Sequence, residues 1–212
     1  MQDLPLINNN NGKLGQFIYH FSISTKKCRH KTRDCVRYCY ADRGSMRYHQ
    51  AEDKRYGINA KWTRHRDFVS LISSQIRLIV YDCQYFRIHT SGDFYNQTYF
   101  NKWVQIANNF QGMKFLAFTR NYELDVSNAP ANLILMFSSD PSTKKYHPSI
   151  KRRARVDYQL DNYESVEEHL ELKGKSKVCR YKCKFCRECW NGDTDVLFPL
   201  KQIKLTTLEI RA

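Results

Sequence analysis

Short apolar runs alternate along this chain with stretches in which apolar residues recur every three or four positions. The short runs predict strands at Leu14–Ser24, Tyr85–Thr90, Met113–Thr119 and Asn132–Ser138. The helical spacing is found in Arg55–Ile79 and in Tyr95–Asn109. Nearly continuous apolar strands joined by helix-length connections are typical of a parallel sheet covered by helices. The predicted fold class is therefore α/β with a mostly parallel sheet.

Weaker patterns follow in the last third of the chain. They predict a short strand at Val156–Leu160, a short acidic helix at Glu164–Leu172 and a final strand or helix at Gln202–Ile210. The 212 residues contain only 8 glycines and 5 prolines, so long flexible linkers are not expected. We interpret residues 1–212 as a single α/β domain, within which residues 173–192 form a cysteine-rich metal-binding loop.

Polar side chains stand at the ends of three predicted strands. They are His89, Ser91 and Asp93 after the first, Thr119, Arg120 and Asn121 after the second, and Ser138, Ser139 and Asp140 after the third. Ligands of parallel α/β sheets bind at the carboxyl ends of the strands. We therefore predict a polar pocket in which His89, Asp93, Arg120 and Asp140 bind or protonate a substrate. Helix capping and a buried core histidine are the alternatives.

Four cysteines fall within eleven residues in the run CRYKCKFCRECW, at Cys179, Cys183, Cys186 and Cys189. The N-terminus has no basic segment followed by an apolar one, so we expect no secretion signal and a cytoplasmic protein with reduced thiols. Thiols crowded in this way indicate a metal centre. The spacing of three, two and two residues favours a [4Fe-4S] cluster, because zinc more often takes two separated pairs of ligands. Zinc is the alternative metal, and small buried residues or disulfides are the alternative to a metal centre.

A second cysteine group comes directly after the first predicted strand. Cys28, Cys35 and Cys39 are separated by six and three residues. Three thiolates can hold a four-iron cluster and leave one iron open, or they can complete a site begun by the C-terminal group. The spacing leaves both arrangements open. Cys83 stands alone before a strand and is interpreted as a small buried residue.

The formal net charge of +14 indicates a polyanionic partner, and nucleic acid is the common one. The basic residues gather around the two cysteine groups and in one further run, and aromatic residues such as Tyr38, Tyr181 and Phe185 stand among them. The predicted nucleic-acid-binding residues are Lys26, Lys27, Arg29, Lys31, Arg33, Arg37, Arg152, Arg153, Arg180, Lys182, Lys184 and Arg187. Aromatic rings beside cations can stack on exposed bases. Solvated surface charge and a small anionic ligand are the alternatives, and no apolar run is long enough to predict a membrane span.

Several segments together resemble the gene product 88 family of phages and mobile elements. They are the C-x3-CYA run at Cys35–Ala41, RIHTSGDFYNQTYFNKWVQIA at Arg87–Ala107, FLAFTR at Phe115–Arg120, LILMFSSD at Leu133–Asp140 and CKFCRECW at Cys183–Trp190. The resemblance implies an origin in a phage, plasmid or integrated element.

That family is in turn similar to radical S-adenosylmethionine enzymes, whose partial α/β barrels carry a C-x3-C-x2-C loop after the first strand. This second resemblance implies a partial or closed TIM-like barrel, with Ser91 and Gly92 as cofactor-binding residues for S-adenosylmethionine. The chain departs from the pattern in two places. The loop after its first strand has the spacing of six and three, and Ser91–Asp93 matches only part of the glycine-rich segment that holds the cofactor.

Three functions fit these observations. The first is an iron–sulfur enzyme, with a radical mechanism, that acts on nucleic acid. The second is a non-catalytic nucleic-acid-binding protein in which zinc or a cluster makes a rigid cysteine loop that presents its basic residues to phosphates. The third is a redox sensor or electron-transfer protein.

Overall fold

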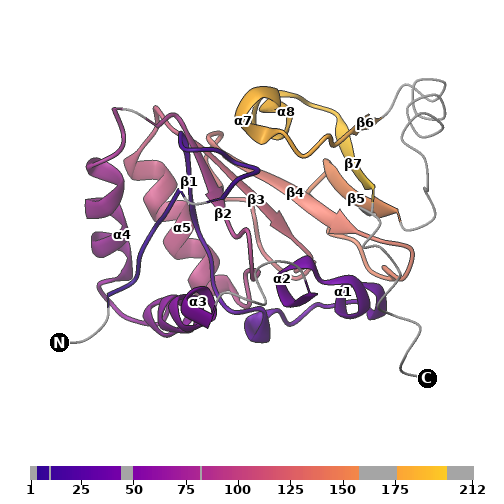
Figure 1. Ribbon diagram of the computed structural model, residues 1–212, viewed down its shortest axis with the longest axis horizontal. Helices are drawn as coiled ribbons and strands as arrows, with labels where there is room; N and C mark the ends of the chain where they lie inside the picture. Colours follow the sequence, from indigo (N-terminus) through magenta and orange to yellow (C-terminus); the bar gives the residue numbers. More distant parts are fainter. Residues whose placement is uncertain (1–3, 10, 44–49, 82, 158–175, 200–212) are drawn as a thin grey trace.

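The computed structural model describes residues 4–9, 11–43, 50–81, 83–157 and 176–199. Seven parallel strands form one sheet in the order β1-β2-β3-β4-β5-β7-β6 (Figure 1). The strands are β1 (Ile18–Phe21), β2 (Tyr85–Ile88), β3 (Lys114–Thr119), β4 (Leu133–Ser139), β5 (Arg153–Asp157), β6 (Ser176–Val178) and β7 (Asp195–Pro199). The prediction of a parallel α/β sheet is confirmed.

The sheet is open. In the part of the chain that the structure describes, β1 and β6 lie at opposite edges and do not pair with each other. The closed form of the predicted barrel is therefore not seen. Strands β6 and β7 were not predicted, because their polar and charged residues hide the strand pattern.

One face of the sheet is covered by α4 (Phe68–Arg77) and α5 (Gln97–Asn109). Helix α5 begins where the Asn96 side chain accepts a hydrogen bond from the backbone N–H of Tyr99 at 2.9 Å. Every third or fourth residue of α5 then faces the strands, as its sequence predicts. At the centre, the ring of Trp103 lies 5.5 Å from that of Phe21 and 5.7 Å from that of Phe86. Aromatic packing of this kind fixes the helical layer against the sheet.

The helical pattern predicted over Arg55–Ile79 is two helices rather than one. α3 (Gln50–Trp62) ends before a turn, and α4 begins at Phe68. The ammonium group of Lys102, on α5, donates to the backbone carbonyls of Thr63 and His65, both at 2.8 Å. These are carbonyls that a helix end leaves without an internal partner. The break is thus stabilised by a side chain from another helix, which no local pattern reveals.

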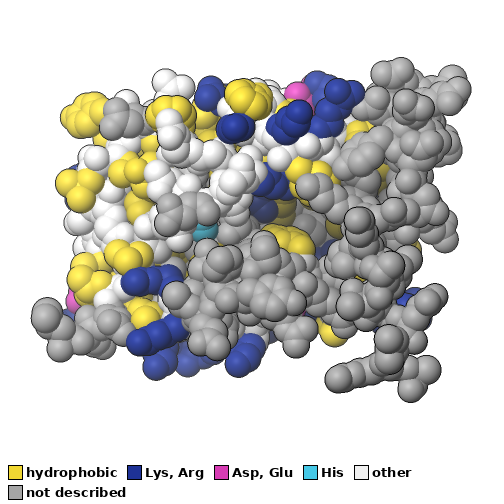
Figure 2. Space-filling model, viewed as in Figure 1, with side chains coloured by type: hydrophobic (Ala, Val, Ile, Leu, Met, Phe, Trp, Pro, Cys, Tyr) yellow, Lys and Arg dark blue, Asp and Glu magenta, His cyan; other side chains and the backbone are white. Residues whose placement is uncertain are grey.

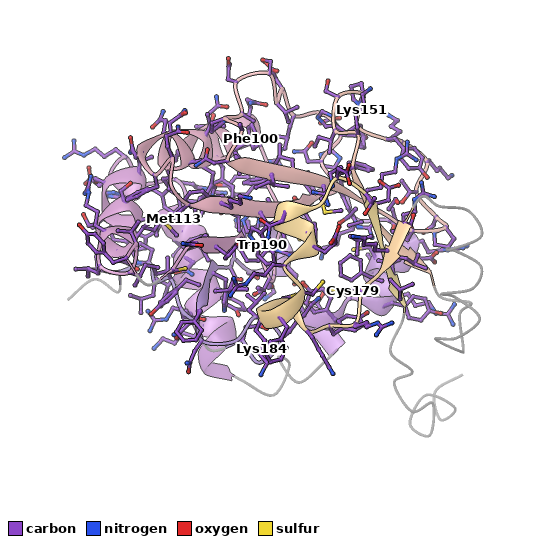
Figure 3. All side chains as sticks on the ribbon, turned by 90° about the horizontal axis from the view of Figure 1, so that it is seen from above. Phe100, Met113, Lys151, Cys179, Lys184 and Trp190 are labelled. Carbon is purple, nitrogen blue, oxygen red and sulfur yellow. The ribbon has the colours of Figure 1, made fainter. Side chains whose placement is uncertain are left out.

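The opposite face of the sheet carries a second, smaller apolar cluster that includes Ile18, Leu116, Met136 and Trp190. The segment that contains α7 (Cys183–Cys186) and α8 (Glu188–Asn191) lies over this face. The indole Nε1 of Trp190 donates to the backbone carbonyl of Phe86 at 3.2 Å, which ties the segment to the middle of β2. Figure 3 looks down on this side and shows Trp190 and Cys179 on the segment.

Short helices at the start of the chain lie at the carboxyl ends of the strands. They are η1 (Thr25–Lys27), α1 (Arg33–Tyr38) and α2 (Tyr40–Arg43) (Figure 1). The weak strand prediction at Val156–Leu160 overlaps β5, which begins earlier at Arg153. The helix predicted at Glu164–Leu172 and the element predicted at Gln202–Ile210 lie outside the described residues. Among the described helices, none is long and apolar enough to span a membrane.

Gly92 should be sensitive to replacement. Its φ is 92°, a region that favours glycine, and a Cβ there would overlap the side chain and the carbonyl of Ile23. We expect Gly92→Ala to lower the free energy of unfolding by about 2 kcal/mol or more. Urea denaturation followed by circular dichroism measures the change.

Gly112→Ala is the matched control, because a Cβ at Gly112 meets nothing within 4 Å. Equal unfolding midpoints for the two variants would contradict the crowding described at Gly92.

Candidate metal centre and basic cleft

The N-terminal cysteine loop is fastened to the carboxyl edge of the sheet. The hydroxyl of Thr32 donates to a carboxylate oxygen of Asp140 at 2.5 Å, and the backbone N–H of Asp34 donates to the hydroxyl of Ser142 at 3.0 Å. The Thr32 hydroxyl also accepts from the backbone N–H of Cys35 at 3.0 Å, so it caps α1. The hydroxyl of Tyr40 donates to the backbone carbonyl of Thr90. The backbone after β2 and two side chains after β4 therefore meet the loop at the predicted edge.

Three of the four predicted catalytic residues come together beneath this loop. A guanidinium nitrogen of Arg120 lies 2.8 Å from a carboxylate oxygen of Asp140. Asp93 accepts from the backbone N–H groups of Phe94 at 2.7 Å and Arg120 at 2.8 Å. Burial raises the pKa of Asp93 to about 6. In the structure these carboxylates hold turns and the loop, which is the capping alternative, and their predicted catalytic role stays a prediction.

His89 lies in the aromatic core rather than at the open edge. Its imidazole Nε2 is 2.8 Å from the hydroxyl of Tyr99, and its ring packs 4.8 Å from that of Phe94. The side chain is buried, and its φ of 62° is unusual for a residue with a Cβ. Burial, with a smaller contribution from Arg87, lowers its pKa to about 3. These are the surroundings of a core histidine.

Ser91 and Gly92, the predicted cofactor-binding residues, join the ends of β1 and β2. The hydroxyl of Ser91 donates to the backbone carbonyl of Ile23 at 3.1 Å, and the backbone N–H of Ile23 donates to the carbonyl of Ser91 at 3.1 Å. Gly92 packs closely against the side chain and carbonyl of Ile23. Both residues are engaged in packing the backbone.

The three N-terminal thiols lie near one another, and neighbouring thiols add to the rise in pKa at Cys28 and Cys39. Burial is the main cause that raises the pKa of Cys28, Cys35 and Cys39. Asp93 raises the pKa of Cys28 further, whereas Arg120 lowers that of Cys35. Charges of both signs therefore surround this group.

The C-terminal cysteines lie on a face of the sheet. Cys179 follows β6, and its backbone N–H donates to the carbonyl of Leu197 at 2.7 Å. Arg187 separates α7 from α8 in a left-handed conformation with φ of 52°. Cys179, Cys183 and Cys189 pack against the apolar cluster of that face, whereas Cys186 is exposed.

A buried arginine lies beneath these thiols. Arg87 is in the middle of β2 and is 7% exposed. Its Nε donates to the carbonyl of His89 at 3.1 Å, and its guanidinium carbon lies 3.7 Å from the centroid of the Phe118 ring. In the described part of the chain, no carboxylate forms an ion pair with it. The thiols of Cys189, Cys183 and Cys179 lie close enough to interact electrostatically with its guanidinium group.

Lys13 is a second cation beside the same thiols. Its ammonium group lies 4.6 Å from the ring centroid of Tyr181 and 5.0 Å from that of Phe198. Burial raises the pKa of Cys183, and it raises that of Cys189 to about 12. Arg87 and Lys13 both oppose this rise. Two cations thus offset part of the effect of burial at the C-terminal thiols, whereas at the N-terminal thiols the Asp93 carboxylate adds to it.

The two cysteine groups occupy different places, one at the carboxyl edge and the other on a face of the sheet. Arg87 interacts electrostatically both with Tyr40, which follows the N-terminal cysteines, and with the C-terminal thiols. Arg87 therefore lies between the two cysteine groups. Across the ranges that the structure describes, no three or more His, Cys, Asp or Glu side chains converge in an arrangement that could hold a metal ion. The predicted metal ligation stays a prediction.

The basic residues predicted to bind nucleic acid have different roles in the structure. Arg152 is built into the fold, since it donates to the carbonyls of Cys189 at 3.1 Å and Thr194 at 3.2 Å. Lys184 and Arg187 lie beside aromatic rings on the α7–α8 segment. Figure 2 shows Lys and Arg side chains gathered around α7 and α8 and in the recess beside them. This face therefore combines positive charge with one exposed ring, that of Phe185, and one partly buried ring, that of Tyr85.

Further basic residues line a cleft of ≈ 730 Å³ at the carboxyl edge of the sheet. Its walls are the N-terminal loop and the connection that follows β4. The lining cations are Arg29, Lys31, Arg33, Arg120, Lys144 and Lys145, and Tyr122 and Phe137 are among the other lining residues. Sequence reasoning placed only half of these cations in a nucleic-acid site and missed Tyr122, Lys144 and Lys145.

Arg87 and Lys13 were also missed. The signal for Arg87 was available, because an arginine between Phe86 and Ile88 in an apolar strand must face the other side of the sheet. Lys13 carried no such signal, since it stands in a polar loop. Its position depends on how residues 11–17 cross the second face.

Comparison with known proteins bears on the origin of the chain. The family model described as Gene product 88 matches residues 4–192. The chain belongs to this family. It is 32% identical over 132 residues to the Gene 88 protein of Mycobacterium phage D29 and, equally, to that of Mycobacterium phage L5; each match covers 54% of this chain and 52% of the relative.

The chain thus spans about half the length of the curated relatives it matches. Both relatives of this gene product 88 protein are phage proteins, which supports the predicted origin in a phage or mobile element. No solved structure matches the chain. The likeness to radical S-adenosylmethionine enzymes has no support from these comparisons.

Two of the buried histidines, His20 and His89, should make the protein less stable in acid. Burial lowers the pKa of His20 to about 4 and that of His89 to about 3, from 6.5. Below pH 6.5 the unfolded chain therefore binds protons at these histidines that the folded chain does not, so they make stability fall as the pH falls towards 4. Asp93, whose pKa is raised to about 6, takes up its proton first in the folded chain and offsets part of this fall. Each histidine contributes up to about 1.4 kcal/mol per pH unit.

Urea denaturation between pH 7 and pH 4.5 measures this slope. We expect His89→Asn, which tolerates the left-handed conformation, to reduce the slope, whatever its effect at pH 7. Parallel curves for the variant and the unsubstituted protein would contradict the neutral, buried state of His89.

Proposed function

We propose that this protein binds an iron–sulfur cluster through Cys179, Cys183, Cys186 and Cys189, and that it binds nucleic acid through the basic surface around them. The observation that carries the proposal is the buried guanidinium of Arg87, which has three thiols and no paired carboxylate beside it in the described residues.

The charge of Arg87 requires a counter-charge. Arginine stays protonated in proteins, and an uncompensated buried charge costs several kcal/mol. Metal binding deprotonates thiols outright, so a metal centre with four thiolate ligands is an anion. Placed over Arg87 and Lys13, such a centre would neutralise both cations. The same cations would offset the rise in thiol pKa that burial causes at Cys183 and Cys189.

The spacing favours iron–sulfur over zinc, since several iron atoms can each take a thiolate from one short loop. Zinc remains the alternative metal, because the charge argument holds for both. The N-terminal thiols fit an anionic centre less well, since the Asp93 carboxylate lies beside Cys28 and opposes further negative charge. S-adenosylmethionine chemistry is not part of the proposal, because Ser91 and Gly92 pack against Ile23.

The nucleic-acid part of the proposal is supported by cations beside aromatic rings, one exposed and one partly buried. The ammonium group of Lys184 lies 4.7 Å from the ring centroid of Phe185, a side chain that is 74% exposed. The guanidinium of Arg187 lies 4.8 Å from the ring centroid of Tyr85. Rings of this kind can stack on bases while the cations contact phosphates. The net charge of +14 points the same way.

Metal analysis tests the first part. Anaerobically purified protein should be brown and contain iron and acid-labile sulfide, and Cys183→Ser with Cys189→Ser should lose both. The buried thiol of Cys83 belongs to neither group, so Cys83→Ala is the control that should retain them. Iron that survives the double substitution but is lost from Cys28→Ser with Cys35→Ser would overturn the assignment. Colourless protein with stoichiometric zinc would establish the alternative metal.

Replacing Arg87 tests the charge argument itself. Without metal, Arg87→Met removes an unpaired buried cation, and we expect the free energy of unfolding to stay equal or to rise by about 1–4 kcal/mol. With metal, the stabilisation that the metal confers should shrink, because the anion loses its partner. The reduction potential of a cluster should fall, since a nearby cation favours the more negative, reduced form.

Arg155→Met is the matched control. Arg155 is half-exposed and pairs with Asp195 at 2.9 Å, away from the thiols. If Arg87→Met and Arg155→Met change the stability of metal-free and metal-loaded protein by the same amounts, Arg87 is not the counter-charge.

A further inference from the structure

We propose that the basic cleft at the carboxyl edge of the sheet binds a nucleoside phosphate, either free or as one unit of a single-stranded nucleic acid. The inference deepens the nucleic-acid part of the proposed function and rests on it. It adds a specific pocket, which lies apart from the α7–α8 segment and is lined by residues 29–33, 120, 122, 137–138 and 141–145.

The charge of the cleft favours a phosphate. Of its six lining cations, Arg120 is committed to Asp140, at 2.8 Å. Within the described residues, no ion pair engages Arg29, Lys31, Lys144 or Lys145. The acids nearby are few: Asp34 lies 3.5 Å from Arg33, and the exposed Glu123 lies 3.7 Å from His30. Positive charge is therefore in excess where the two walls meet.

The walls of the cleft are fastened to each other. The Thr32 hydroxyl and the Asp34 backbone N–H on one wall bind Asp140 and Ser142 on the other. The Asp140 carboxylate also accepts from the backbone N–H of Ser142 at 3.0 Å, which fixes the turn after β4. A cleft held in shape in this way loses little conformational freedom when a ligand binds.

An aromatic ring in the cleft indicates more than a bare phosphate. The ring of Tyr122 lies 4.7 Å from that of His30, and the ammonium group of Lys145 lies 5.1 Å from its centroid. Phe137 also lines the cleft, but its side chain is buried, so Tyr122 is the ring that a ligand can reach. Rings beside cations suit a planar base joined to a phosphate. The volume of ≈ 730 Å³ also falls within the range of pockets for small organic ligands and exceeds what an inorganic phosphate fills.

The experiment measures fluorescence anisotropy of a short labelled single-stranded oligonucleotide with the full chain, using AMP, adenosine and inorganic phosphate as competitors. Lys31→Gln, Lys144→Gln and Lys145→Gln together should weaken oligonucleotide binding and reduce the slope of log Kd against log salt by about 2. The control carries the same charge loss at exposed residues outside the cleft, as Lys61→Gln, Arg64→Gln and Arg66→Gln. It should bind nearly as the unsubstituted protein does.

Tyr122 separates stacking from charge. Tyr122→Leu should weaken binding roughly tenfold, whereas Tyr122→Phe should retain it, because phenylalanine keeps the ring. Displacement by AMP, but not by adenosine or phosphate alone, would show that a free nucleotide fits. Oligonucleotide binding that depends on the cleft residues but resists AMP would assign the cleft to a unit within a strand. Both outcomes support the inference.

Three outcomes would overturn it: equal weakening by the cleft and control charge variants, no effect of Tyr122→Leu, or inorganic phosphate that competes as well as AMP. Oligonucleotide binding that is unchanged in the cleft variants would refute this inference and leave the proposed nucleic-acid binding standing. AMP binding that is measured directly by calorimetry and lost in the cleft variants, without any oligonucleotide binding, would refute only the nucleic-acid binding of the proposed function. The iron content of each variant reports on the metal centre independently.

Discussion

The sheet has two faces to bury, and among the described helices α4 and α5 cover only one of them. The other face depends on a short cysteine-rich segment, held by the Trp190 indole on the carbonyl of Phe86. Such a segment brings little apolar area. This face accordingly tolerates a charged side chain, Arg87, in the middle of a strand, and thiols rather than branched aliphatic residues lie next to it.

The carboxyl edge of the sheet is held by polar contacts rather than by apolar packing. Asp140 gathers Thr32, Arg120 and the turn that follows β4, so that one carboxylate joins segments more than a hundred residues apart. The edge is polar, with hydrogen bonds and an ion pair at Asp140, whereas the face below α7 and α8 holds an apolar cluster, thiols and cations. The two cysteine groups therefore belong to two chemically distinct environments, which makes a single shared centre the less natural arrangement.

Much of the fold could be predicted because several of its strands and helices have a clear local pattern of apolar residues. The strands β2, β3 and β4 and the helix α5 have long apolar stretches, and the structure places them within a few residues of the expected bounds. The split between α3 and α4 could not be predicted, since it depends on Lys102 from α5. Strands β6 and β7 were missed because the short strand β6 and the charged start of β7 carry no alternation.

For the candidate site, the cysteines and the carboxyl edge were visible in the sequence, but the roles of individual residues were not. In the sequence, the position of His89 beside Ser91 and Asp93 indicates a catalytic residue. In the structure, its backbone is left-handed and its ring lies in the core, next to the hydroxyl of Tyr99. The cations beside the C-terminal thiols are Arg87 and Lys13, which stand far from the cysteines in the chain. Only the sheet brings them together.

That distance has a thermodynamic consequence. The four C-terminal cysteines are close neighbours in sequence, but the cation beneath them and the carbonyl that holds Trp190 lie about a hundred residues earlier, in β2. A ligand that binds only when β2 is in place stabilises the whole sheet by mass action, and a weakened sheet releases the ligand. For the proposed metal centre, folding and metal binding would then be coupled in one equilibrium. A destabilising substitution in the helical layer would therefore lower the metal content of the protein.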